Sequence, residues 1–178
     1  MPVQNGSATI KRYLLVAVVL LLTVTACDSP STGSGGGMQP TMTAQQASLR
    51  VADYAQRAFA ALPPPAALVK WAGDNNNPCD DPTDNGPQGR VVPYAEYKIT
   101  GLPPDQYNHY FDVLRQWWAS HGFRVLADDR PKDLYLWVEN NGDGFRMALQ
   151  ANDVGPLYLT STAPCVWPNG TPEPSPTS

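Results

Sequence analysis

Residues 134–162, LYLWVENNGDGFRMALQANDVGPLYLTST, decide the fold of this chain. Leu134 to Glu139 alternates apolar and other side chains with the two-residue period of a strand, and Asn140 to Gly144 has the composition of a hairpin turn. Phe145 to Ala151 returns along the first strand, and Leu157 to Thr162 follows a second short turn. Because consecutive strands joined by short turns pair antiparallel, the stretch predicts an antiparallel sheet.

Working outward, Val92 to Thr100 and Phe123 to Leu126 read as two further strands, which brings the expected sheet to about five. A first helix is predicted over 44–62. Thr43 and Gln46 fit a capping box at its start, and the prolines from Pro63 end it.

A second helix is predicted to begin within Leu102 to Asp105, where prolines suit the first turn. Its apolar side is rich in aromatic residues, so we expect it to bury more than the alanine-rich first helix. His121 is expected to cap its C-terminus and Gly122 to adopt the left-handed conformation. Two amphipathic helices need an apolar sheet face to cover. The predicted fold is therefore α+β, a two-layer sandwich with an antiparallel sheet and both helices packed on one face.

The N-terminus has the plan of a secretory signal. Lys11 and Arg12 precede an apolar run from Tyr13 to Val24, which is too short for an ordinary transmembrane helix. The string Val24-Thr25-Ala26-Cys27 resembles the bacterial lipobox. That resemblance implies cleavage between Ala26 and Cys27 and lipid on Cys27, so 1–26 would be a lipoprotein signal peptide. An uncleaved signal anchor is the alternative.

The segments that flank the core are poor in apolar residues. Residues 27–42 are rich in Gly, Ser, Thr and Pro, which predicts a flexible tether after the lipidated cysteine. Residues 168–178 are predicted to form a disordered tail. A single α+β domain is expected over 43–167.

The charge of the chain excludes nucleic acid as a partner. Twelve basic and 16 acidic residues give a net charge of −4. Loss of Lys11 and Arg12 with the signal leaves a mature chain of net −6. No basic stripe is present, so the lipid on Cys27 is the expected contact with the membrane.

Two cysteines remain after Cys27, namely Cys79 and Cys165. An even pair in an exported chain predicts a disulfide, with a metal site or a reactive thiol as the alternatives. Residues 63–91 between the first helix and the first expected strand are predicted to be irregular, because Asx, Pro and Gly crowd them. A calcium loop counted from Asp81 is the alternative there, but its twelfth position is Val92 rather than the required glutamate.

Aromatic residues are the candidates for a ligand surface, in particular Trp71, Trp117 and Trp118. Trp117 and Trp118 differ by about 100° around a helix, so only one of them fits the core. The other either packs under the 63–91 segment or forms an exposed surface for a sugar or a protein.

No constellation typical of a catalyst is present in the sequence. His109 and His121 lie too far apart on one helix to share a metal, and neighbouring Asp128 and Asp129 suit a turn. Glu139 and Asp143 are expected to be solvated beside the hairpin. We therefore expect no cofactor, no metal and a non-catalytic binding or interaction module for an envelope protein or glycan. The alternative is an exported hydrolase of envelope glycans that uses two carboxylates converging in a pocket.

Several motifs together resemble small actinobacterial cell-envelope lipoproteins. They are the lipobox, a cysteine before the first expected strand, a Trp-bearing helix ending in His121-Gly122-Phe123, and the closing Ser161-Thr162-Ala163-Pro164-Cys165. The resemblance covers most of the mature chain and implies a mycobacterium-like envelope, with the protein lipid-anchored on the extracytoplasmic face of the cell membrane. It implies no particular activity.

Overall fold

The computed structural model describes residues 42–79, 87–151 and 155–171. The expected signal peptide, Ala26, Cys27 and most of the tether lie outside these residues, as does most of the calcium-loop candidate. The elements in chain order are α1 (Ala44–Phe59), β1 (Ala67–Asp74), β2 (Tyr94–Thr100), a 3₁₀ turn (Pro104–Gln106), α2 (Tyr107–Ser120), β3 (Phe123–Asp128), β4 (Leu134–Asn140), β5 (Arg146–Ala151) and β6 (Leu157–Thr162).

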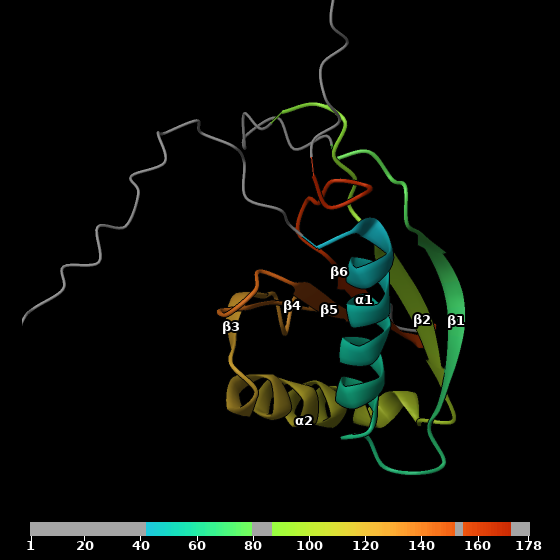
Figure 1. Cartoon of the computed structure of the whole chain (residues 1–178). Coiled ribbons are helices and arrows are strands. Elements are labelled where there is room, and N and C mark those ends of the chain that lie inside the picture. The colour runs from blue at the N-terminus through green and yellow to red at the C-terminus, as the bar shows by residue number, and fades with distance from the viewer. Residues whose placement is uncertain (1–41, 80–86, 152–154, 172–178) are drawn as a thin grey trace, which may run out of the picture. The chain divides into compact units, whose positions relative to one another are not determined.

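The six strands form one antiparallel sheet in the order β1-β2-β6-β5-β4-β3. The predicted meander is confirmed as β4, β5 and β6, and β2 joins it by pairing with β6. Helix α1 lies against β2 and β6, whereas α2 lies against β3 and β4 (Figure 1). The α+β two-layer fold is therefore confirmed, with six strands rather than five.

The additional strand, β1, falls within the segment predicted to be irregular, so that prediction was wrong for Ala67–Asp74. The strand pairs with β2 at the edge of the sheet, and its register shifts between Lys70 and Ala72. An edge strand is exposed on both faces, and a bulge breaks the two-residue period. The alternation that identifies the other strands is therefore missing here.

Both predicted helices are present, but α1 ends at Phe59 rather than at 62. The Thr43 hydroxyl accepts a hydrogen bond from the Gln46 amide at 3.1 Å, and the Gln46 side chain accepts one from the Thr43 amide at 2.9 Å, which confirms the capping box. Helix α2 begins later than expected, at Tyr107, because its first turn is 3₁₀. At its C-terminus, His121 Nδ1 lies 2.7 Å from the Trp117 carbonyl oxygen, and Gly122 has φ +82°.

The core lies between the helices and one face of the sheet. Helix α1 contributes Val51 and four alanines, whereas α2 contributes Phe111, Leu114 and Trp118 among its buried side chains. The aromatic helix therefore supplies the larger buried surface, as predicted. Among the described helices, none is both long and apolar enough to cross a bilayer.

A disulfide links the segment that follows β1 to the segment that follows β6. Cys79 and Cys165, 86 residues apart in sequence, are joined with their Cα atoms 5.8 Å apart. The chain remains ordered beyond the expected boundary at 167, because the Pro168 carbonyl oxygen accepts a hydrogen bond from the Ala44 amide at 3.1 Å. The first residues of the predicted tail thus belong to the domain, and 172–178 lie outside the described residues.

Candidate functional site

The three tryptophans proposed from sequence do not share one surface. Trp118 is fully buried in the core, so it cannot contact a ligand. Trp117 stacks on His121 with ring centroids 4.0 Å apart, and its ring centroid lies 6.4 Å from that of Phe123. Trp71 is 62% exposed on β1. Of the three, only Trp71 belongs to the surface described below.

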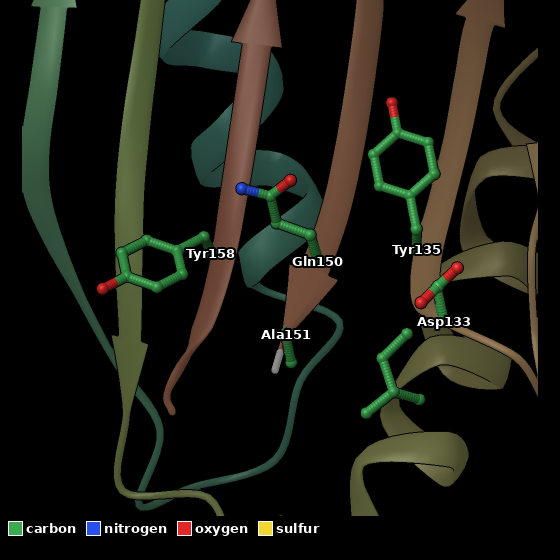
Figure 2. Close-up of a pocket in the computed structure, with 6 residues that line it drawn as sticks. Asp133, Tyr135, Gln150, Ala151 and Tyr158 are labelled. Atoms are coloured by element: carbon green, nitrogen blue, oxygen red, sulfur yellow. The ribbon is translucent and has the colours of Figure 1, made fainter. Parts of the chain in front are cut away.

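The face of the sheet away from the helices is uncovered in the described structure. Register places Lys98, Tyr158, Gln150 and Tyr135 in one row across β2, β6, β5 and β4. Figure 2 shows Tyr158, Gln150 and Tyr135 projecting from neighbouring strands, with α1 on the far side of the sheet. This row therefore forms an aromatic and amide surface on the open face.

A second row of side chains lies two residues further along the strands and has small residues at its centre. It places Thr160 and Ala148 between Glu96 on β2 and Trp137 on β4. Because Thr160 and Ala148 are small and their neighbours are large, the surface is hollowed here, with a volume of about 300 Å³. Tyr135, Trp137, Arg146, Gln150 and Thr162 also line this hollow.

A second hollow of about 300 Å³ adjoins the first and shares Tyr135 and Gln150 with it. Asp133, Leu134, Ala151 and Tyr158 complete its lining (Figure 2). We call the two hollows together the open-face trough. Its lining comprises the residues just named, namely Asp133, Leu134, Tyr135, Trp137, Arg146, Ala148, Gln150, Ala151, Tyr158, Thr160 and Thr162. From Arg146 to Gln150 it follows β5 for about 13 Å, at ~3.3 Å per residue.

One guanidinium at the end of the trough is held in place by its neighbours. Arg146 lies over the Trp137 ring, with Cζ 5.3 Å from the centroid, and its Nε donates to Glu139 Oε2 at 2.8 Å. Arg124 on β3 donates to the other oxygen of Glu139. The hydrogen bonds from Arg146 and Arg124 hold the pKa of Glu139 below its ordinary value. The single carboxylate of Glu139 therefore pairs with two guanidinium groups, so these three side chains together carry a net positive charge.

The aromatic lining continues toward the sheet edge. Trp71 meets Tyr158 edge-on with centroids 6.2 Å apart, and Lys98 Nζ lies 5.6 Å from the centre of the Trp71 ring. Trp71 follows Val69, the register partner of Lys98, by two residues, so it lies on the same face beside the row formed by Lys98 and Tyr158. Burial raises the pKa of Tyr135, and its phenol is able to donate a hydrogen bond to a ligand.

The expectation that Glu139 and Asp143 are solvated was wrong. The Glu139 side chain is only 14% exposed between its two arginines, and that of Asp143 is 19% exposed. Asp143 accepts hydrogen bonds from Tyr54 at 2.8 Å and Arg50 at 3.1 Å. It therefore ties the β4–β5 hairpin to α1, which the sequence pattern does not indicate.

Two further acidic residues, Asp128 and Asp112, are also engaged in structural contacts. Asp128 and Asp112 both accept hydrogen bonds from Arg130, and Arg130 holds the pKa of Asp128 below its ordinary value. Neither trough hollow, nor the one beside α2 at Arg115, is lined by more than one acidic residue. Among the described residues, no group of three or more His, Cys, Asp or Glu side chains is placed to hold a metal ion.

Comparison with protein-family models, with curated proteins and with solved structures found no match to this chain. The function must therefore be inferred from the site itself.

The residues of the trough were not among those predicted from the sequence to bind a ligand. The available signal was the second face of the predicted strands, where Tyr135 and Trp137, and again Tyr158, Thr160 and Thr162, recur at every second position. Large aromatic residues on the face opposite the core indicate a surface that binds something.

Proposed function

We propose that this protein is a non-catalytic binding module, anchored by lipid on Cys27 to the extracytoplasmic face of the cell membrane, and that the open-face trough is its ligand site. The observation that carries the proposal is the composition of the trough. It combines the aromatic rings of Tyr135, Trp137 and Tyr158 with the hydrogen-bonding side chains of Gln150 and Thr160. Ligand sites typically combine an apolar or aromatic lining with a few placed polar groups.

The arrangement of the sheet supports a binding role. A two-layer fold can leave its outer sheet face polar, because that face contributes nothing to the core. Here the outer face instead carries aromatic residues on β1, β4 and β6, and small residues at the centre keep the trough open. Partly exposed aromatic side chains such as those of Tyr135, Trp137 and Tyr158 offer an apolar body together with a polar tip to a partner.

The proposed location rests on the sequence and on the disulfide. The lipobox-like string ending at Cys27 predicts the anchor, and two acyl chains on one cysteine are enough for stable attachment. The Cys79–Cys165 bridge supports export, because structural disulfides form and persist in oxidising compartments. A lipid-anchored protein of this kind would meet its ligand in the cell envelope.

A carboxylate-based hydrolase is not favoured by any described feature. Such an enzyme needs two acids that flank the scissile bond. Glu139, Asp128 and Asp112 instead bind arginines, and Asp133 is the one acid that lines the trough.

Co-sedimentation with the insoluble envelope fraction of the producing cell tests the trough directly. Ala148→Trp would fill its floor, and Leu49→Trp places the same side chain on an exposed position of α1, in the other layer. We expect Ala148→Trp to abolish sedimentation and Leu49→Trp to sediment like wild type, with both variants retaining the wild-type circular dichroism spectrum. Equal sedimentation of both would contradict the proposal.

A further inference from the structure

The charged group nearest the trough floor is a cation with unused hydrogen-bonding capacity. Arg146 engages Glu139 through Nε, and no described residue forms a hydrogen bond with its two Nη groups. Its side chain is 46% exposed and lines the hollow over Ala148 and Thr160. The unoccupied side of the guanidinium therefore faces a surface that a ligand is able to reach.

The orientation of this guanidinium is fixed before any ligand arrives. Trp137 supports one face of the group, and the Nε bond to Glu139 sets its rotation. A planar guanidinium in fixed orientation recognises a carboxylate through two parallel N–H···O hydrogen bonds. Because little rotational freedom remains to be lost, such a contact would be strong for an exposed site.

The charge at the Arg146 end of the trough favours an anion, whereas Asp133 lies in the other hollow. Arg146 is the only charged residue among those lining the hollow over Ala148, and Glu139 behind it is shared with Arg124. This local positive charge occurs on a chain whose net charge is −4. The ligand group that complements this end of the trough is therefore negative, whereas the protein as a whole repels anions.

The rest of the trough fits a sugar rather than an extended apolar ligand. Tyr135, Trp137 and Tyr158 present aromatic rings against which the C–H face of a sugar ring packs, and Gln150, Thr160 and Thr162 offer donors and acceptors for hydroxyl groups. The trough is open along its length, as a chain-like ligand requires.

Taking the trough as the ligand site proposed above, we infer that it binds an acidic oligosaccharide, with the carboxylate of one sugar unit held by Arg146 and neighbouring sugar rings packed along Trp137, Tyr135 and Tyr158. Arg146 is the specificity-determining residue for the carboxylate, and the aromatic residues supply affinity for any sugar of fitting shape.

Isothermal titration calorimetry of the full chain in detergent tests this inference with two matched probes. One is a short galacturonic acid oligomer, and the other is the same oligomer with its carboxyl groups reduced to alcohols. We expect the acidic oligomer to bind about tenfold more tightly or better, the size of one charge-assisted pair. Arg146→Gln should reduce its affinity to that of the reduced oligomer.

Arg57→Gln is the matched control, because Arg57 is an exposed arginine that pairs with Asp53 on α1 and lines neither hollow. It should retain the preference for the acidic oligomer to within about twofold, and both variants should melt within a few degrees of wild type, as is usual for surface substitutions. Equal binding of the two oligomers by wild type, or equal loss of preference in both variants, would overturn the inference. If neither oligomer binds while Ala148→Trp still abolishes sedimentation with the envelope, the acidic-sugar inference is wrong and the proposed function stands.

Discussion

Arg146 lies over the ring of Trp137, with its Cζ 5.3 Å from the centroid, while its Nε donates to Glu139 at 2.8 Å. The three side chains come from adjacent positions of β4 and β5 on the open face of the sheet. They give that face a cation of fixed orientation beside an aromatic ring, and this feature distinguishes the open-face trough from an ordinary polar sheet surface.

Glu139→Gln should weaken the fold modestly and make it less sensitive to acid. The variant removes a largely covered carboxylate from two arginines, so we expect the free energy of unfolding at neutral pH to fall by about 1–2 kcal/mol. The folded-state pKa of Glu139 is depressed. Its carboxylate therefore contributes to the free energy of unfolding at pH values above the ordinary glutamate pKa of about 4.3, and this contribution is lost as the pH falls through the lower folded-state pKa. Urea unfolding at pH 7 and pH 3 measures this, and an equal loss of stability at both pH values would contradict it.

Tyr54→Phe should reduce the sensitivity of the fold to alkali. Burial and the hydrogen bond to Asp143 raise the pKa of Tyr54 to about 12. A raised pKa stabilises the folded state fully below the unfolded value of about 10, and this stabilisation is lost as the pH rises through 12. We expect the variant to be less stable than wild type at pH 8, with a smaller further loss between pH 10 and 12. Thermal melts over this range test the expectation, and Tyr94→Phe serves as a comparison of the same residue type.

Replacing Cys79 and Cys165 by serine together should cost about 2–5 kcal/mol, because the bridge restricts a long loop of the unfolded chain. Urea unfolding of wild type and of the double variant measures the difference, and adding a reductant should lower the stability of wild type alone. A double variant as stable as the oxidised wild type would show that the bridge is dispensable for the fold.

Cys27→Ala should leave an unprocessed precursor that carries no lipid. If Val24 to Cys27 is a lipobox, signal peptidase II cleaves only after Cys27 has been lipidated. Mass spectrometry of the membrane fraction distinguishes the two forms. If the variant is still cleaved to the mature size, the lipobox interpretation of Val24 to Cys27 is incorrect.

Local sequence signals predicted the parts of the fold that depend on neighbouring residues. The Thr43–Gln46 capping box, the α2 terminus at Gly122 and the β4–β5 hairpin follow from residues a few positions apart. Strand β1 was missed because an edge strand with a bulge shows no alternation.

The trough is harder to predict, since it depends on strand order. Tyr158, Gln150 and Tyr135 become neighbours only when β6, β5 and β4 pair in register. The partners of Glu139 and Asp143 show the same dependence, because Arg124 and Arg50 reach them from other elements. Sequence alone indicated that aromatic residues were available, but it did not indicate which of them share a surface.

Site-specific photo-crosslinking in the intact producing cell tests the central claim most directly. A photoreactive amino acid at Gln150 would stand in the trough, and one at Leu49 would stand on exposed α1 in the other layer. The account predicts that the probe at Gln150 forms adducts with envelope glycan, that Ala148→Trp suppresses them, and that the probe at Leu49 forms none. Glycan adducts from Leu49 at the same yield as from Gln150, or adducts at Gln150 that survive Ala148→Trp, would contradict the claim that the open face of the sheet is the ligand site.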